Sequence, residues 1–242
     1  MDQLVHLDSP SPLPSQRRLG PKGKALGAGA VSAKRATQRT NDPERTMAGI
    51  LEVAHTEFSE KGLAGARIDE IAASTQTSKR MIYYYFGSKE GLYLAVLEEA
   101  YRSMRLTESQ LHLEDLAPEE ALRKLVGFTF DHHNANERYI RLVMSENMHR
   151  GAYLKQSKII QKLNVTAIDA IRKLYERGVE GGIFRANLDP VDIHKTISAL
   201  TFFDVSNKHT FGLIFKTNTQ TSKALAARRD SIIETIVRSV RV

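Results

Sequence analysis

The 242-residue sequence contains no cysteine, and this absence removes three kinds of chemistry. Without thiols the chain can form no disulfide framework, no thiolate metal site and no cysteine nucleophile. No segment approaches the run of about eighteen apolar residues that marks a membrane helix, and no apolar stretch at the N-terminus could act as a signal peptide. With 41% hydrophobic residues a sizeable core can still be buried, so we expect a soluble, cytoplasmic protein.

The motifs of several common enzyme classes are also absent. The chain has no G-x-G-x-x-G or G-x-x-x-x-G-K-[ST] phosphate loop, no H-E-x-x-H zinc helix and no G-x-S-x-G nucleophile elbow. Gly20, Gly23, Gly27 and Gly29 lie in a basic segment that lacks the strand and helix a nucleotide loop requires. We therefore predict that the protein is not an enzyme and carries no cofactor.

Positive charge is concentrated at the N-terminus. Residues 1–41 hold seven basic groups against two acidic ones, which is +5 of the formal net charge of +7. Because this segment is also rich in Pro, Ser, Gly and Ala, we interpret it as a disordered basic arm. It could be a solubilising tail, or an arm that follows DNA phosphates or enters the minor groove.

The most informative stretch runs from residue 67 to residue 89. Ile68, Ile71 and Ala72 are spaced i, i+3, i+4, which predicts one apolar face of a short helix. Residues 74–77 are long enough only for a tight turn, and Ser78 offers a hydroxyl to cap a second helix. Two short helices joined in this way are typical of a helix-turn-helix, whose second helix presents its N-terminal residues to the major groove.

Four runs within this stretch carry a closer likeness: Ile71-Ala72, Thr77-Ser78-Lys79, Ile82-Tyr83-Tyr84-Tyr85-Phe86 and Ser88-Lys89-Glu90-Gly91-Leu92. Together they resemble the DNA-binding signature of the tetracycline-repressor (TetR) family of bacterial regulators, and the likeness extends back through residues 48–62. Two positions depart from the family. A capping hydroxyl is missing near Ala66 and Arg67, and Gln76 stands where the family has a turn glycine. We therefore expect Gln76 to adopt a positive φ, at a cost of about 1 kcal/mol.

The resemblance and the side-chain chemistry together nominate a set of DNA-contacting residues. The planar fork of Arg80 matches the O6 and N7 acceptors of guanine. Thr77 and Ser78 are short enough to reach phosphates or bases. By resemblance Tyr83, Tyr85 and Lys89 contact phosphates, whereas Ile82 and Phe86 pack inside the small domain. The full set is Arg67, Thr77, Ser78, Lys79, Arg80, Tyr83, Tyr84, Tyr85 and Lys89.

Helical periodicity continues along the rest of the chain, with no strand-like alternation. Asp42-Pro43 and Asp189-Pro190 are helix-start signals, and Gly62 is placed to end the first helix. Besides the two motif helices, we expect helices at 42–62, 88–111, 118–136, 137–150, 153–179, 189–207 and 221–240, with 208–220 as a loop or a short helical turn. The prediction is an all-α fold of about nine helices. It comprises a helix-turn-helix domain at 42–88 and a ligand-sensing and dimerisation domain at 89–242.

In the TetR family the second half of the chain is a sensor for a small molecule, and its pocket residues vary with the ligand. Polar residues within apolar helical stretches are therefore the only indication of a pocket: His132, His133, Tyr139, Arg141, Glu146, Asn147, His149, Arg150, Phe203, Asp204 and Asn207. Arg141 would suit a carboxylate and Phe203 an aromatic ring, although each could instead be a surface group or a satisfied core group. Adjacent histidines on a helix point about 100° apart, which argues against a metal site.

Helices 190–207 and 221–240 resemble the pair that builds a four-helix dimer interface in the family, although their apolar faces could simply close the monomer core. We interpret the chain as a ligand-responsive transcriptional repressor. It would bind a palindromic DNA operator as a homodimer and be released by a small-molecule effector. Two alternatives stay open: activation instead of repression, and non-specific or architectural DNA binding through the basic tail.

Overall fold

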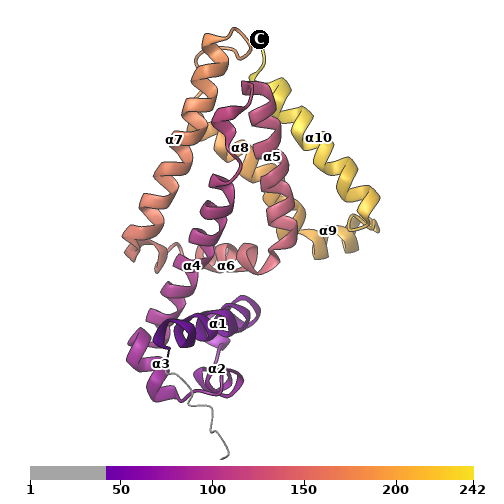
Figure 1. Cartoon of the computed structure of the whole chain (residues 1–242). Coiled ribbons are helices and arrows are strands. Elements are labelled where there is room, and N and C mark those ends of the chain that lie inside the picture. Colours follow the sequence, from indigo (N-terminus) through magenta and orange to yellow (C-terminus); the bar gives the residue numbers. More distant parts are fainter. Residues whose placement is uncertain (1–41) are drawn as a thin grey trace, which may run out of the picture. The chain divides into compact units, whose positions relative to one another are not determined.

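The computed structural model describes residues 42–242, in which every element longer than three residues is an α-helix (Figure 1). The helices are α1 (Pro43–Gly65), α2 (Ile68–Ser74), α3 (Lys79–Phe86), α4 (Lys89–Ser109), α5 (Pro118–Ala135), α6 (Glu137–Met148), α7 (Lys158–Glu180), α8 (Pro190–Ser206), α9 (Lys208–Phe215) and α10 (Ser222–Val240). The all-α prediction is confirmed, with ten helices in the described part of the chain instead of about nine. The predicted arm at 1–41 lies outside the described residues.

The predicted helix starts are confirmed by their capping hydrogen bonds. Oδ1 of Asp42 accepts from the backbone N–H groups of Glu44 and Arg45, and Pro43 occupies the first helical position of α1. Asp189 caps α8 in the same way through the N–H of Val191. Each cap satisfies backbone donors that have no partner within the helix, so a short local sequence is sufficient to specify the start.

Gly62 interrupts α1 at the predicted position. Its backbone has φ 66° and ψ 175°, which lies outside the helical region and is accessible to glycine without a Cβ clash. The chain then continues as helix to Gly65, three residues beyond the predicted end. The N–H of Ala66 donates to the carbonyl of Gly62, and this hydrogen bond helps to turn the chain toward α2.

Two predicted segments differ from the structure. Residues 208–215 form the eight-residue helix α9, where we expected a loop or a short turn. Tertiary contacts stabilise this helix, because the Lys208 side chain binds Glu137 of α6 and the Phe211 ring contacts the ring of Phe203. The helix expected from residue 153 begins instead with the 3-10 turn Leu154–Gln156, and Ser157 caps α7 after it.

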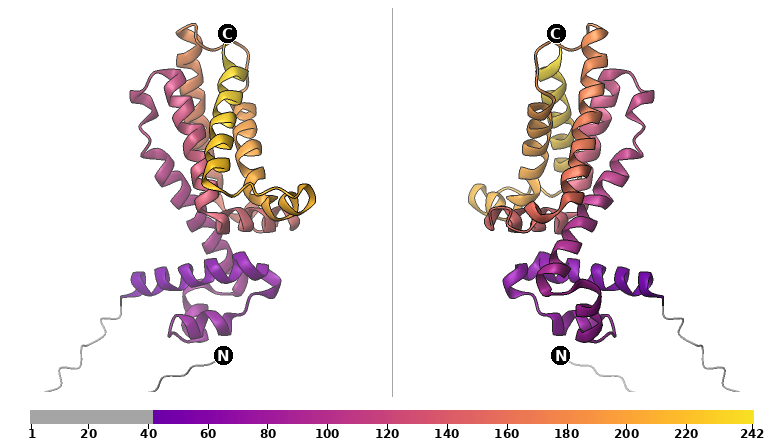
Figure 2. Two further views of the ribbon diagram at one scale, coloured as in Figure 1. Left: turned by 90° about the vertical axis from the view of Figure 1, so that its right-hand side faces the viewer. Right: turned by 90° about the vertical axis from the view of Figure 1, so that its left-hand side faces the viewer.

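Two large hydrophobic clusters organise the described residues. One lies within the body, where α5, α7, α8 and α10 run alongside one another and bury residues such as Leu122, Leu174 and Ile236 (Figure 2). The other lies among α1–α4, where Ile50, Phe58, Ile71, Ile82 and Leu97 have no exposed surface. This second cluster also includes Leu142 of α6 and Ile160 of α7. The helix-turn-helix therefore shares its core with the body.

Helix α4 connects the two clusters. It contacts α1 and α3 of the helix-turn-helix side and α5 and α7 of the body. Within the described range, no helix combines the length and apolar character of a membrane span. The domain boundary at residue 88 stays a prediction, because α4 begins directly after it and packing continues across it.

Candidate nucleic-acid interface and ligand clefts

The helix-turn-helix is built from α2 and α3 around a tight turn. Oγ of Ser78 accepts from the N–H of Met81 at 3.2 Å and caps α3, while the fully buried Ile82 anchors α3 in the core. Gln76 has φ 51°, which confirms the positive φ expected at the turn. Arg67 stands at the N-cap of α2 without a side-chain capping bond, and its N–H donates to Oε1 of Glu57 at 3.0 Å.

The start of α3 presents polar side chains away from this core. Arg80 is exposed and makes no ion pair or side-chain hydrogen bond with the described residues. Lys79 is paired with Asp69 of α2, and both side chains are about half exposed. Tyr84 is 77% exposed and Tyr83 is 44% exposed. Because large aromatic rings are rarely left in water without a partner surface, this face is a candidate interface.

The remaining predicted contacts lie around this face. Tyr85 is only partly exposed and sits edge-on between Tyr84 and Phe86, so it supports the neighbouring rings. Lys89 is half-buried at the start of α4, and its Nζ donates to the carbonyl of Ala64 at 3.4 Å. Thr77 is half-buried within the turn. These nine residues remain predicted DNA contacts.

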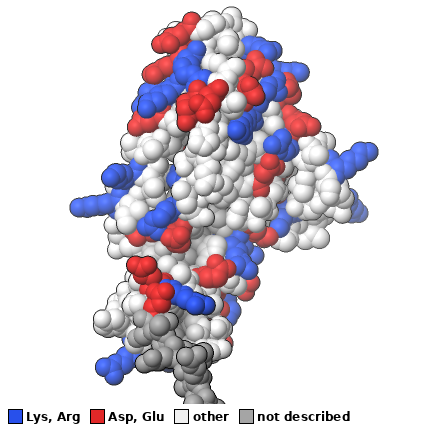
Figure 3. Space-filling view, in the orientation of Figure 1, with Lys and Arg blue, Asp and Glu red and all other residues white. Residues whose placement is uncertain are grey.

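The described residues carry little excess charge. Residues 42–242 contribute only +2 of the formal +7, and Figure 3 shows acidic and basic side chains interspersed over the body on the face drawn. DNA binding by this part of the chain therefore depends on where cations are placed, not on a broad positive field.

Three predicted ligand residues meet between α5 and α6. The imidazole of His133 stacks on the Tyr139 ring with centroids 6.2 Å apart, and the His132 ring meets Tyr139 edge-on at 5.9 Å. Burial lowers the pKa of His133 to about 4 and also lowers that of His132, so both are neutral at pH 7. Burial raises the pKa of Tyr139. The Nδ1 atoms of both histidines are buried and have no hydrogen-bond partner within residues 42–242.

A buried arginine near these rings was not recognised from the sequence. The Arg105 side chain of α4 is 10% exposed, pairs with Glu108 and donates to Oδ1 of Asn164 on α7 at 3.1 Å. Its Nε has no partner in the described range. Burial is the main reason that the pKa of Glu108 is raised. A single arginine in a helical pattern gives no local signal that it packs against distant residues such as Asn164.

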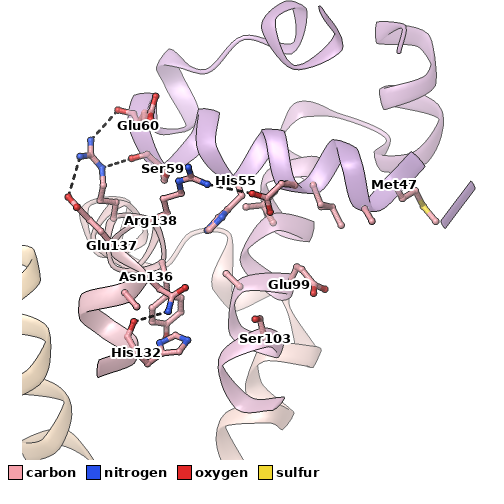
Figure 4. Close-up of a pocket in the computed structure, with 18 of the residues that line it drawn as sticks. Met47, His55, Ser59, Glu60, Glu99, Ser103, His132, Asn136, Glu137 and Arg138 are labelled. Atoms are coloured by element: carbon pink, nitrogen blue, oxygen red, sulfur yellow. Dashed lines mark hydrogen bonds and ion pairs between the residues drawn. The ribbon is translucent and has the colours of Figure 1, made fainter. Parts of the chain in front are cut away.

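A cleft of about 970 Å³ opens between α1, α4 and the corner where α5 meets α6 (Figure 4). Among the predicted ligand residues it is lined by His132, Tyr139 and Arg141. Sequence reasoning missed His55, which faces the cleft from α1, because the helical pattern does not show which residues of distant helices it meets. Burial lowers the pKa of His55, and its buried Nε2 has no partner within the described chain.

Arg141 is tied to the end of α1. Its Nε donates to the carbonyl of Ser59 at 2.7 Å, and its Nη2 donates to the carbonyl of Glu60 at 3.4 Å. It also lies 3.9 Å from Glu137 (Figure 4). The guanidinium suggested for a ligand carboxylate is thus already used to hold the helix-turn-helix against α6.

The other predicted ligand residues separate into two groups. Phe203, Asp204 and Asn207 line a second hollow of about 390 Å³, where Asp204 pairs with Arg228 of α10 at 2.9 Å. The second group lies at the end of α6 and directly after it, and lines neither hollow: Glu146, Asn147, His149 and Arg150. Oε2 of the buried Glu146 accepts from the N–H of Leu154 at 2.9 Å. The side chains of Asn147 and His149 bond to nearby carbonyls of α6, and Arg150 is exposed with φ 56°.

Two family models match the chain. The model described as "Bacterial regulatory proteins, tetR family" matches residues 50–96, and "Tetracyclin repressor-like, C-terminal domain" matches residues 118–236. The chain is 33% identical over 203 residues to the HTH-type transcriptional repressor NicS of Pseudomonas putida, covering 84% of this chain and 96% of NicS. It is 34% identical over 139 residues to the HTH-type transcriptional repressor SCO4008 of Streptomyces coelicolor, covering 57% of this chain and 69% of that protein.

Solved structures show the same fold. A Streptomyces coelicolor protein, SCO4942, superimposes with a TM-score of 0.63 at 26% identity, over 81% of this chain and 98% of that one. A tetR-family regulatory protein from Rhodococcus RHA1 gives a TM-score of 0.66 at 21% identity, over 81% of this chain and 97% of that one. The fold of the described chain is therefore shared with solved bacterial proteins.

Proposed function

Because this chain belongs to the TetR family of bacterial regulators, we propose that it is a transcriptional repressor, active in the cytoplasm, that a small-molecule effector releases from DNA. It binds a palindromic operator as a homodimer. The observation that carries this proposal is the exposed start of α3, where Arg80 has no partner within the described chain and Tyr83 and Tyr84 face solvent. Two relatives that match much of this chain are named transcriptional repressors, which favours repression over activation.

The predicted contacts divide into one reader of bases and several anchors. Arg80 reads a guanine through two parallel hydrogen bonds, because its guanidinium is exposed and uncommitted in the first turn of the recognition helix. Tyr83, Tyr84 and Lys89 bind phosphates, and such contacts position the protein without reading sequence. Lys79 must exchange its pair with Asp69 for a phosphate, at little cost, since exposed ion pairs contribute about 0–1 kcal/mol.

Smaller contacts complete the same surface. Thr77 and Ser78 lie at the junction of the turn and α3, where short hydroxyls reach either a phosphate or a base edge. Arg67 is exposed at the start of α2 and takes the place of the missing capping hydroxyl as a phosphate contact. Tyr85 contributes mainly by supporting the ring of Tyr84.

Dimerisation through α8 and α10 supplies the second recognition helix. The inner faces of both helices contribute to the body core through residues such as Ile193, Ile197 and Val237. Part of α8 is exposed, with Val191 39% exposed and Phe203 44% exposed beside the Phe211 ring of α9. A two-fold axis beside this exposed part gives the pair of recognition helices that a palindromic operator requires.

The effector acts by shifting a population. In one conformation the two recognition helices do not match the operator, and the effector has a higher affinity for this conformation than for the DNA-bound one. Effector binding therefore lowers the population of the DNA-bound conformation. His132, His133 and Tyr139 of the body, and Phe203, Asp204 and Asn207 of the smaller hollow, are the predicted residues best placed to line an effector site.

The test is a binding titration of the full chain with the DNA upstream of its own gene. Fluorescence anisotropy measures the affinity at several salt concentrations. A random duplex of equal length is the control. We expect a clear preference for the upstream DNA, two chains per duplex and a steep loss of affinity with salt. Equal, weak binding to both duplexes would instead favour non-specific or architectural DNA binding.

A further inference from the structure

The cleft between α1, α4 and the α5–α6 corner has the size of a small-molecule site and lies between the helix-turn-helix and the body. Its volume of about 970 Å³ lies at the upper end of the roughly 300–1,000 Å³ typical of ligand pockets. Its walls come from α1 and α4 of the helix-turn-helix side and from the α5–α6 corner of the body (Figure 4). A molecule in this cleft would touch both regions at once.

The floor of the cleft is apolar and partly aromatic. Met47 and Leu51 of α1, Phe86 of α3, and Val96 and Ala100 of α4 all line it. Removing such surfaces from water is favourable in proportion to the area covered. The floor therefore selects a ligand with a sizeable hydrocarbon or aromatic part.

The rim of the cleft is acidic. Five carboxylates line it against two guanidinium groups, and these are Glu44, Glu52, Glu60, Glu99 and Glu137 against Arg138 and Arg141. Three of the carboxylates are ion-paired, because Glu52 lies 3.5 Å from Arg138, Glu99 pairs with Arg102 and Glu137 pairs with Lys208. Arg141 is used to hold the end of α1. The two lining histidines add no positive charge at pH 7, because burial lowers the pKa of each. With Arg102 and Lys208 counted, five carboxylates face four cationic side chains, so the rim keeps a formal excess of one negative charge and favours a cation over an anion.

One polar group in the wall lacks a partner. The Nε2 atom of His55 is buried without a hydrogen bond in the described chain, which is uncommon in folded proteins and calls for an explanation. His55 lines the cleft, but its Nε2 atom is closed to solvent, so a polar atom of a bound molecule reaches it only when the imidazole turns toward the cleft.

From these observations we infer that the cleft between α1, α4 and the α5–α6 corner binds an amphipathic organic cation, and that this cation is the effector. The second half of the inference rests on the proposed function. The apolar floor takes the hydrocarbon part of the cation, and the carboxylate rim takes its charge. This site is separate from the smaller hollow between α8 and α10.

Binding in the cleft would act directly on the helix-turn-helix. Three polar contacts tie α6 to α1 beside the cleft. Arg141 donates to the carbonyls of Ser59 at 2.7 Å and of Glu60 at 3.4 Å, and Arg138 lies 3.5 Å from Glu52. A cation that approaches Glu52 competes with Arg138 for the same carboxylate. The tie between α1 and the body then weakens, and the recognition helix can move away from its DNA-bound position.

The experiment compares two ions of the same shape and opposite charge. The full chain is titrated by calorimetry with tetraphenylphosphonium and, separately, with tetraphenylborate. We expect one saturable phosphonium site per chain and at least tenfold weaker binding of the borate. Equal or tighter binding of the borate would overturn the inference, because the acidic rim would then play no part.

Two variants locate the site. Ala48→Phe places a ring in the cleft from an exposed position on α1, and we expect it to weaken phosphonium binding at least tenfold. The matched control is Ala170→Phe at an exposed position of α7 that does not line the cleft, and we expect unchanged binding. Circular dichroism checks that both variants fold. Equal phosphonium affinity in the two variants would place the site elsewhere.

A second pair of variants tests the charge. Glu52→Gln combined with Glu99→Gln removes two rim carboxylates, and we expect about tenfold weaker phosphonium binding. Glu176→Gln, an exposed carboxylate of α7 outside the cleft, is the control and should leave the affinity unchanged. No difference between the double variant and the control would contradict a cation site.

The DNA readout separates this inference from the proposed function. Saturating phosphonium is expected to lower the affinity for the upstream DNA at least tenfold in the unmodified chain and to have little effect in Ala48→Phe. Unchanged DNA affinity would overturn the assignment of the cleft as the effector site. If the chain shows no preference for the upstream DNA without phosphonium, the proposed function is refuted. Calorimetry would still show in that case whether the cleft binds an organic cation.

Discussion

In the helix-turn-helix the predicted DNA-contacting side chains lie outside an apolar core, whereas in the body several predicted ligand-contacting side chains lie inside the fold. Arg80 and Tyr84 face solvent, while His133 is 4% exposed and Tyr139 is 8% exposed. The difference follows from the two partners. DNA is large and approaches from outside, so its contacts must be exposed. A small ligand is surrounded, so its polar contacts are buried at a cost in desolvation.

The two regions also differ in how their cores are closed. The body cluster is formed entirely by residues after the helix-turn-helix, but the α1–α4 cluster is completed by Leu142 and Ile160 from the body. Arg141 reinforces this contact through the carbonyls at the end of α1. The helix-turn-helix is therefore positioned by the body, which is what transmission of a ligand signal requires.

The largest expected effect comes from breaking the shared core. Phe58 has no exposed surface and meets the Tyr93 ring edge-on at 5.2 Å, so Phe58→Ala should lower the free energy of unfolding by about 3–5 kcal/mol. Because Leu142 and Ile160 belong to the same cluster, we expect one cooperative transition in denaturant. The matched control is Phe215→Ala at a 59% exposed ring, with a much smaller loss. A helix-turn-helix that melts alone, with the body at its normal midpoint, would contradict the shared core.

The next largest effect is a pH dependence of stability that comes from His133, a buried polar residue of the body. Burial lowers the pKa of His133 to about 4, below its ordinary 6.5, so protonation favours the unfolded chain. The stabilisation by the neutral His133 side chain is fully present above pH 6.5. As the pH falls from 6.5 toward 4, the free energy of unfolding decreases by roughly 3 kcal/mol at most. Unfolding curves of His133→Phe should lack this part of the pH dependence. The control, His149→Phe, replaces an exposed side chain and should retain it.

The smallest effect separates two kinds of predicted DNA contact, a reader of bases and a phosphate anchor. Arg80→Ala should cost about 1–3 kcal/mol of binding to the upstream DNA and relax the preference at one base pair in each half-site. Lys89→Ala should weaken binding to all sequences evenly and reduce the salt slope by about 1. Anisotropy on single-base-pair variants of the DNA measures both. If the two substitutions gave the same profile across sequences, Arg80 would be an anchor and not a reader.

The helix-turn-helix could be predicted in detail because its signals are local. The caps at Asp42 and Ser78 and the positive φ at Gln76 each depend on a few neighbouring residues, and the structure confirms them. Helix α9 was missed because it depends on contacts with Glu137 and Phe203, which are distant in sequence or belong to another helix. Local propensity cannot report such contacts.

The sequence by itself determined the family, the all-α class and the residues of the recognition helix, since periodicity, caps and a contiguous motif are properties of short segments. Only the tertiary structure decided which polar residues meet. It brought His55, His132 and Arg138 to one cleft from three helices, and it assigned Arg141 to the carbonyls of α1. The physical reason is that a cleft is defined by helices that pack together from distant parts of the chain, and no single helical repeat encodes its neighbours.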